Sequence, residues 1–110
     1  MDIIIRKLEK RDYEKGFLET LSNLSTIGDV PKETFLEVFE KMEKRGEYFV
    51  FVAELDGKVV GTATLMVQQL FAHSGGRVGH IENVVTRKGF EGRGIGTKLM
   101  ERVIEESKAR

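Results

Sequence analysis

The stretch HIENVVTRKGFEGRGIGTKLMERV, residues 80–103, decides the fold. Its beginning is rich in β-branched residues and reads as a strand, whereas Ile95, Leu99 and Val103 repeat at the spacing of an amphipathic helix. The loop between them contains Gly89, Gly92, Gly94 and Gly96. Glycine lets backbone N–H groups turn toward a ligand, and such groups at a helix N-terminus favour negative charge. The stretch therefore predicts an anion site where the strand passes into the helix.

Other readings of the glycine loop are weaker. GRGIGTK lacks the spacing of a Walker A loop, and GFEGRG has its glycines in the wrong order for a dinucleotide fingerprint. A mobile glycine-rich turn that binds nothing stays an alternative. Binding of RNA phosphates is disfavoured, because the net charge is zero and no aromatic platform lies beside the basic residues.

The composition describes one ordinary globular domain over residues 1–110. Eighteen basic and eighteen acidic residues balance, so no overall charge favours nucleic acid or a membrane surface. The absence of cysteine excludes disulfides, thiolate metal sites and a cysteine nucleophile. Only three consecutive apolar residues follow Asp2, too few for a signal segment or membrane span. We expect a cytoplasmic protein without a metal.

Outward from the loop, the pattern predicts an α+β fold with the order β-α-α-β-β-β-α and helices packed on the sheet. The expected strands cover residues 3–8, 48–55, 58–71 and 78–86. The expected helices cover residues 12–24, residues 31–45 and the region after the loop, and Asp12 is expected to cap the first of them. The Asp56-Gly57 pair predicts a tight hairpin turn. The expected core includes Phe35, Phe39, Phe49, Phe51, Leu99 and Val103.

FEGRGIGTKLMERVIEES, residues 90–107, resembles the acyl-CoA pyrophosphate loop of the GCN5-related N-acetyltransferases (GNAT). LSTIGDV (24–30), KVVGTATL (58–65), HSGGRVGHIENVV (73–85) and RGIGTKLM (93–100) resemble the glucosamine-6-phosphate branch, in the same order. The resemblance implies the GNAT fold and direct transfer of acetyl from acetyl-CoA to an amino-sugar phosphate. Transfer to another small amine, or a catalytically silent CoA-binding fragment, stay as alternatives.

The resemblance also implies roles for particular residues. The pyrophosphate would lie on the backbone of Gly92, Arg93, Gly94, Ile95, Gly96 and Thr97, and the pantetheine arm on Val84, Val85 and Thr86. A distortion of the strand would free an amide near Val84 to stabilise the thioester oxyanion. The catalytic set would be Glu82, Asn83 and Val84, with Glu82 accepting the proton of the ammonium.

The sugar would contact Ser25, Leu70, Phe71, Ala72, His73, Glu82 and Asn83. Simpler readings compete with several of these. Glu82 can pair with Arg77 or Arg93, Ser25 can merely end a helix, and His73 can be a solvated turn residue. His80 is expected to be a partly buried, hydrogen-bonded scaffold residue.

Four departures from the branch matter. Glu91 stands where the loop usually begins with Gln or Arg, Asn83 replaces an aspartate, and Leu70 replaces a basic residue. The resemblance also implies a further strand-helix-strand portion carrying the tyrosine that protonates the leaving thiolate, and neither Tyr13 nor Tyr48 matches it. We therefore expect a truncated chain and a homodimer formed through the unpaired edge of the last strand.

Overall fold

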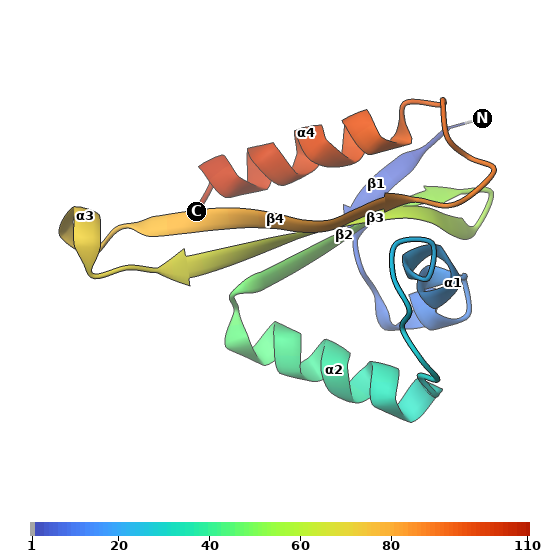
Figure 1. Cartoon of the computed structure of the whole chain (residues 1–110), viewed down its shortest axis with the longest axis horizontal. Coiled ribbons are helices and arrows are strands. Elements are labelled where there is room, and N and C mark those ends of the chain that lie inside the picture. Colours follow the sequence, from blue (N-terminus) through green and yellow to red (C-terminus); the bar gives the residue numbers. More distant parts are fainter. Residues whose placement is uncertain (1) are drawn as a thin grey trace.

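The computed structural model describes residues 2–110 as a four-stranded antiparallel sheet in the order β1-β2-β3-β4, with helices on both faces (Figure 1). The strands are β1 (Ile4–Lys7), β2 (Tyr48–Leu55), β3 (Lys58–Gln69) and β4 (Arg77–Thr86). The helical elements are η1 (Lys10–Tyr13), α1 (Phe17–Leu21), α2 (Lys32–Arg45), α3 (Ala72–Gly75) and α4 (Ile95–Lys108). This is the GNAT arrangement predicted from the sequence.

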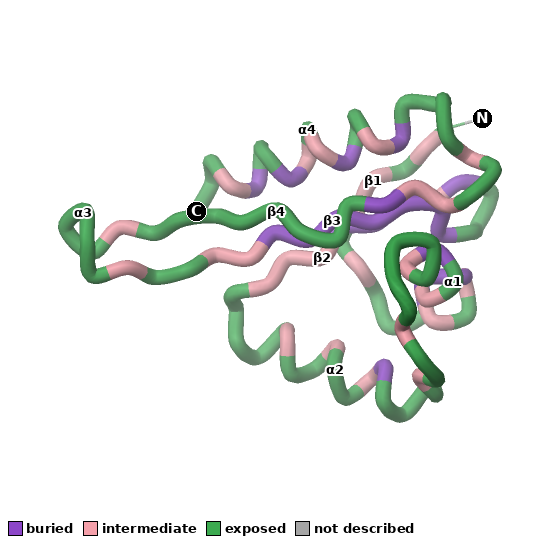
Figure 2. The backbone as a smooth tube through the Cα atoms, in the orientation of Figure 1, coloured by how far each residue is buried: buried purple, intermediate pink, exposed green. Residues whose placement is uncertain are grey.

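Each face of the sheet has its own hydrophobic cluster. On one face α4 contributes Ile95, Leu99 and Val103, which pack against apolar side chains of β2 and β3. On the other face Phe17 of α1 and Phe35 of α2 close a smaller cluster. The buried residues gather in the halves of β2 and β3 next to the Asp56-Gly57 turn and along the inner side of α4 (Figure 2). The sheet thus separates the α4 side from the α1 and α2 side.

The hairpins follow the sequence pattern closely. Asp56 and Gly57 have φ of 51° and 75°, the left-handed pair that a type I′ turn requires. The end of the β3–β4 hairpin, with α3 at its tip, projects beyond the helices as an arm (Figure 1). The turn at its tip contains left-handed His73 and Ser74, with φ of 52° and 57°. Strand β3 ends at Gln69 rather than at the expected residue 71.

The expected helix over residues 12–24 is wrong, because the chain forms η1 and then the short helix α1. Gly16 separates them with a φ of 89°, and the Lys15 carbonyl accepts a hydrogen bond from Val59 N (2.8 Å). A backbone that pairs with β3 at this point cannot continue a helical ladder. Leu24, the last residue of the expected helix, lies beyond α1 and is 46% exposed.

Asp12 is an ion-pair partner rather than the cap of a long helix. It is fully buried and accepts two hydrogen bonds from Arg6, at 2.7 and 2.8 Å, and one from Glu9 N. Burial raises the pKa of Asp12, but these hydrogen bonds outweigh it and hold the pKa below its usual value. Arg6 also pairs with Glu54, which lowers the pKa of that carboxyl. The cluster joins β1, η1 and β2.

Smaller corrections concern α2 and the core. Pro31 is the residue before α2 rather than its first residue, and Val38 within α2 is 46% exposed. Phe39 and Phe49 are only partly buried, unlike Phe35. Helix α2 therefore covers the sheet loosely. Within residues 2–110, no helix is long and apolar enough to cross a membrane.

Candidate active site

The start of α4 presents a run of free backbone N–H groups. Gly94, the residue before the helix, has a φ of 78°, and its carbonyl accepts the first helical hydrogen bond, from Lys98 N (3.0 Å). Within the described part of the chain, the N–H groups of residues 92–97 have no hydrogen-bond acceptor. Six consecutive free N–H groups at a helix N-terminus form an anion site. These are the residues for which the family resemblance implied pyrophosphate contacts.

The preceding half of the loop is held by the protein itself. Arg87 N donates to Val60 O (2.7 Å), Lys88 N to Asn23 Oδ1 (2.6 Å), and Phe90 N to Arg87 O (3.0 Å). Gly89 N donates to the Glu91 carboxylate (2.8 Å). The loop therefore divides at Glu91 into an anchored half and a half that is available to a ligand.

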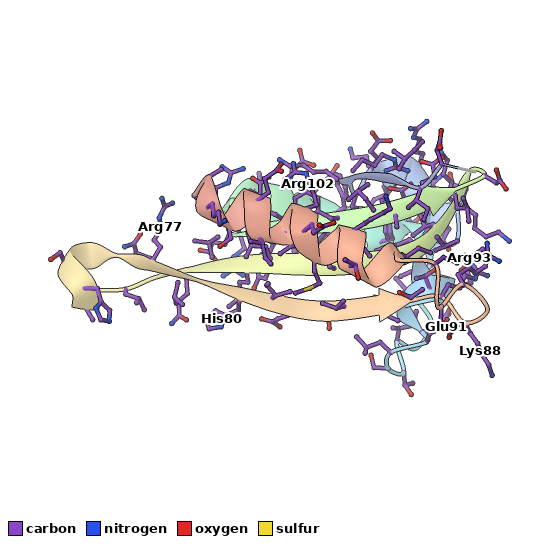
Figure 3. All side chains as sticks on the ribbon, turned by 90° about the horizontal axis from the view of Figure 1, so that it is seen from above. Arg77, His80, Lys88, Glu91, Arg93 and Arg102 are labelled. Carbon is purple, nitrogen blue, oxygen red and sulfur yellow. The ribbon has the colours of Figure 1, made fainter. Side chains whose placement is uncertain are left out.

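Glu91 turns toward the anchored half. Hydrogen bonds from its own N–H and from Gly89 N lower the pKa of its carboxyl. Arg93 lies over the ring of Phe90, 5.1 Å from the centroid, and Lys88, Glu91 and Arg93 surround the same end of β4 (Figure 3). A Gln in place of Glu91 could accept the same hydrogen bond without the charge. The departure at Glu91 thus leaves the six free N–H groups uncovered.

Gly61 on β3 sets how closely α4 approaches the sheet, a role that was not predicted from the sequence. A Cβ at this position would lie 2.7 Å from Ile95 Cγ2 and 3.0 Å from Leu99 Cδ1. Only glycine therefore permits the present position of the first turns of α4. An isolated glycine within a strand pattern was the available signal.

Strand β4 carries a β-bulge beside the loop. Thr62 pairs with Val85 and Thr64 with Glu82, so that Asn83 and Val84 together oppose the single residue Ala63. Asn83 has a φ of 54°, which is rare for a residue other than glycine. The distortion expected in this strand is present, and bulges leave a residue outside the ladder. The backbone near Val84 is thereby available to a ligand.

His80 and Glu82 lie before the bulge, opposite Met66 and Thr64. His80 is exposed rather than partly buried, and its Nε2 lies 2.9 Å from Gln68 Oε1. Glu82 is exposed and makes no ion pair within residues 2–110. The pairing with Arg77 or Arg93 considered from the sequence is therefore not formed, and the Glu82 carboxylate is free.

The residues predicted for the sugar do not gather at one place. Residues 70–73 lie at the tip of the arm, at the opposite end of β4 from the glycine loop (Figure 1). Ten residues of strand span roughly 33 Å, so these residues lie far from the loop of the same chain. Phe71 is fully exposed at this tip. Ser25 is exposed in the connection between α1 and α2.

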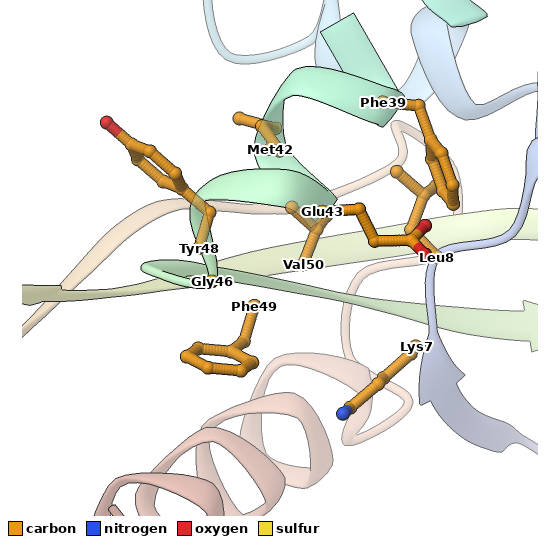
Figure 4. A pocket seen from close by; sticks show the side chains of 9 residues that line it. All are labelled: Lys7, Leu8, Phe39, Met42, Glu43, Gly46, Tyr48, Phe49 and Val50. Carbon is orange, nitrogen blue, oxygen red and sulfur yellow. The ribbon is translucent and has the colours of Figure 1, made fainter.

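An apolar cavity of about 240 Å³ lies under α1 and α2 and reaches the bulge. Its lining includes Leu21, Ile27 and Phe35, with Thr64 and Asn83 at the sheet. A cleft of about 340 Å³ lies where α2 ends above β1 and β2, between Lys7, Tyr48 and Phe49 (Figure 4). No residue of the bulge or glycine loop lines this second cleft.

Neither tyrosine approaches the glycine loop. Tyr13 donates to Val30 O (3.4 Å) and packs on Phe35, whereas Tyr48 borders the cleft at the end of α2. Among residues 2–110, no cluster of three or more His, Asp or Glu side chains is arranged to hold a metal ion.

Comparison with known proteins agrees with this geometry. The model of the acetyltransferase (GNAT) family matches residues 4–110. A glucosamine 6-phosphate N-acetyltransferase of Arabidopsis thaliana is 36% identical over 108 residues, which are 96% of this chain and 72% of the relative. The enzyme of the same name from Candida albicans is 34% identical over 97 residues, 86% of this chain and 65% of the relative.

The solved structures give the same picture. The crystal structure of glucosamine-6-phosphate N-acetyltransferase from Arabidopsis thaliana superposes with a TM-score of 0.96 at 35% identity, covering 99% of this chain and 76% of that one. An acetyltransferase of Trypanosoma brucei superposes with a TM-score of 0.89 at 30% identity, covering 98% and 76%. The chain therefore matches about three quarters of each structure.

Proposed function

This chain belongs to the GNAT acetyltransferase family, and from that premise we propose that it transfers acetyl from acetyl-CoA to the amine of glucosamine-6-phosphate in a ternary complex. The observation that carries the proposal is the pairing of six free N–H groups at residues 92–97 with the bulge at Asn83 and Val84. The names of the similar enzymes support the amino-sugar phosphate as acceptor.

On the donor side, the pyrophosphate of CoA would accept hydrogen bonds from residues 92–97, at the positive end of α4. The pantetheine arm would follow the backbone of Val84, Val85 and Thr86, which leads from the loop to the bulge. Exposed Lys88 and Arg93 add positive charge at this end. Acetyl-CoA would thus lie along the end of β4, with its thioester beside the bulge.

In the reaction, the neutral amine attacks the thioester carbonyl, a C–N bond forms and the C–S bond breaks. CoA leaves as its thiolate, which takes up the proton that the acetylated nitrogen loses. Negative charge develops on the carbonyl oxygen, where the amide near Val84 would stabilise it, an effect worth about 3 kcal/mol for one such donor. The Glu82 carboxylate, which has no ion-pair partner within residues 2–110, would accept the proton of the ammonium before attack. Asn83 would contribute a hydrogen bond to the acceptor without the charge of an aspartate.

The proposal includes a homodimer. The tip of the arm, residues 70–73, and the connection between α1 and α2, which contains Ser25, lie far apart within one chain (Figure 1), so a sugar held by both requires a second copy. Val78, Ile81 and Val84 stay 37–38% exposed along β4, an edge strand of the described sheet, and such edges favour pairing. A chain without cysteine also suits the cytoplasmic setting that we propose.

Two observations support a second class of acceptor, a small amine that carries an apolar group. The apolar cavity under α1 and α2 reaches Asn83, and Leu70 replaces a basic residue of the branch. Both features favour a small amine with an apolar group over a sugar phosphate.

The test measures thiol release from acetyl-CoA with and without glucosamine-6-phosphate. We expect sugar-dependent release, which Glu82→Gln abolishes while CoA binding by calorimetry is retained. His80→Gln is the matched control on the same strand face, and it should keep the activity. Release with apolar amines but not with the sugar would establish the second class, and absence of CoA binding would reject both.

A further inference from the structure

One side chain joins the connection between α1 and α2 to the glycine loop. Asn23, two residues beyond α1, accepts a hydrogen bond from Lys88 N at 2.6 Å across 65 residues of sequence. Within the described part of the chain, this is the only hydrogen bond between residues 22–31 and residues 86–97. The contact therefore joins two segments that otherwise have no polar link.

The rest of the connection has few restraints. Its first residues remain bonded to α1, since Asn23 N donates to Thr20 O and Leu24 N to Leu21 O. The N–H groups of residues 25–30 have no hydrogen-bond acceptor within residues 2–110, and most of these residues are exposed. A backbone with so few bonds has several accessible conformations, and one added restraint at its start limits them.

The Asn23 contact is part of the anchoring of the loop. Because Asn23 accepts a hydrogen bond from Lys88 N, all four N–H groups of residues 87–90 have acceptors. The run of free N–H groups begins after this anchored half, at Gly92. Without the Asn23 amide, Lys88 N would lose its acceptor, and the backbone of residues 87–90 would have more accessible conformations. A ligand on residues 92–97 would then have to order more of the loop, which weakens binding.

We propose that Asn23 is a positioning residue that couples the two substrate sides, so that CoA on the glycine loop orders residues 25–30 for the acceptor. The inference rests on the proposed function, because it needs CoA at residues 92–97 and an acceptor beside Ser25. Asn23 itself touches neither substrate; it acts through the Lys88 backbone. The coupling is reciprocal: an acceptor that orders residues 25–30 would raise the affinity for CoA by the same factor by which CoA raises the affinity for the acceptor.

The test combines hydrogen exchange with calorimetry on the whole chain, using CoA as the probe. In the wild type, CoA should slow amide exchange at residues 25–30. Asn23→Leu and Asn23→Ala remove the acceptor oxygen from an exposed position, and they should abolish this slowing and weaken CoA binding about fivefold, the value of one ordinary hydrogen bond. Asn23→Asp keeps an oxygen at the same place and should restore the slowing.

Ser22→Ala is the matched control, because Ser22 Oγ donates to Glu19 O within α1 and does not reach the loop. It should behave as the wild type. CoA binding without slower exchange at residues 25–30, or with equal slowing in Asn23→Leu, would overturn the coupling while the proposed function stands. Absence of CoA binding in the wild type would instead reject the proposed function, and the coupling with it.

Discussion

Gly61→Ala should displace the beginning of α4, and with it the anion site, because Gly61 lies on β3 directly beneath this helix. The added Cβ would lie 2.7 Å from Ile95 Cγ2 and 3.0 Å from Leu99 Cδ1, and Val85 O would be 3.4 Å away. Carbon atoms in good contact are about 3.5–4.0 Å apart, so the beginning of α4 must move outward by about 1 Å. The six N–H groups of residues 92–97 would move with it, away from the bulge of β4.

The cost has two measurable parts. Overpacking of this kind destabilises by about 1–3 kcal/mol, which corresponds to roughly 4–12 °C in the melting temperature of a domain of this size. A shift of about 1 Å in the groups that hold the pyrophosphate would misplace the thioester beside the bulge, and a misplacement of that size lowers the rate by on the order of 100-fold. Thermal unfolding and thiol release from acetyl-CoA measure the two parts separately.

A second substitution checks that the clash is the cause. Ile95→Leu removes the Cγ2 methyl nearest to the new Cβ and keeps the side chain apolar, so the double variant Gly61→Ala/Ile95→Leu should recover part of both losses. Gly61→Ala with an unchanged melting temperature and rate would refute the reasoning. So would a double variant no better than the sum of its parts.

Three further perturbations test other parts of the molecule. Asp12→Asn should lower the free energy of unfolding by about 3 kcal/mol, because Arg6 loses its buried partner; a loss below 0.5 kcal/mol in urea titration would contradict this. The lowered pKa of Asp12 stabilises the wild type above pH 4, so stability should fall as the pH drops below about 4 and Asp12 takes up its proton, and this slope should shrink in Asp12→Asn. Asn83→Val should destabilise by about 1–2 kcal/mol, because a β-branched residue tolerates the positive φ poorly, whereas Asn83→Gly should keep the fold and lose acetyl transfer; equal stability of the two variants would argue against strain at the bulge. Glu91→Gln keeps an acceptor for Gly89 N and removes a negative charge near the loop, so calorimetry at low ionic strength should show tighter CoA binding, with a gain that vanishes at high salt; a salt-independent change would point to altered loop structure.

Local patterns predicted most of the sheet and both long helices. Strand β2 was predicted residue for residue, the Asp56-Gly57 turn has the expected geometry, and α4 follows the loop as its spacing indicated. These features depend on neighbours in sequence, such as alternation, turn chemistry and helical periodicity. The ends of β3 and α2 differ by one or two residues, where competing local preferences are nearly equal.

The features that failed depend on distant partners. Asp12 looks like a helix cap from its neighbours, but Arg6 pairs with it, and Lys15 bonds to β3 instead of continuing a helix. Gly61 acquires its meaning only when α4 packs on it, and Asn23 only when Lys88 comes beside it. The bulge at Asn83 has no local signature, and its expectation came from family resemblance alone.

The two hydrophobic clusters on opposite faces of the sheet have a consequence for how such a protein can diverge. The α4 cluster and the cluster of Phe17 and Phe35 share no residue. Substitutions in well-separated clusters act nearly additively. A lineage can therefore remodel the α1 and α2 side while selection keeps the α4 side unchanged; under the proposed function, this would alter the acceptor amine without disturbing the site for CoA. Asn23 would be the exception under the proposed coupling, because its hydrogen bond to Lys88 N joins the α1–α2 connection to the glycine loop.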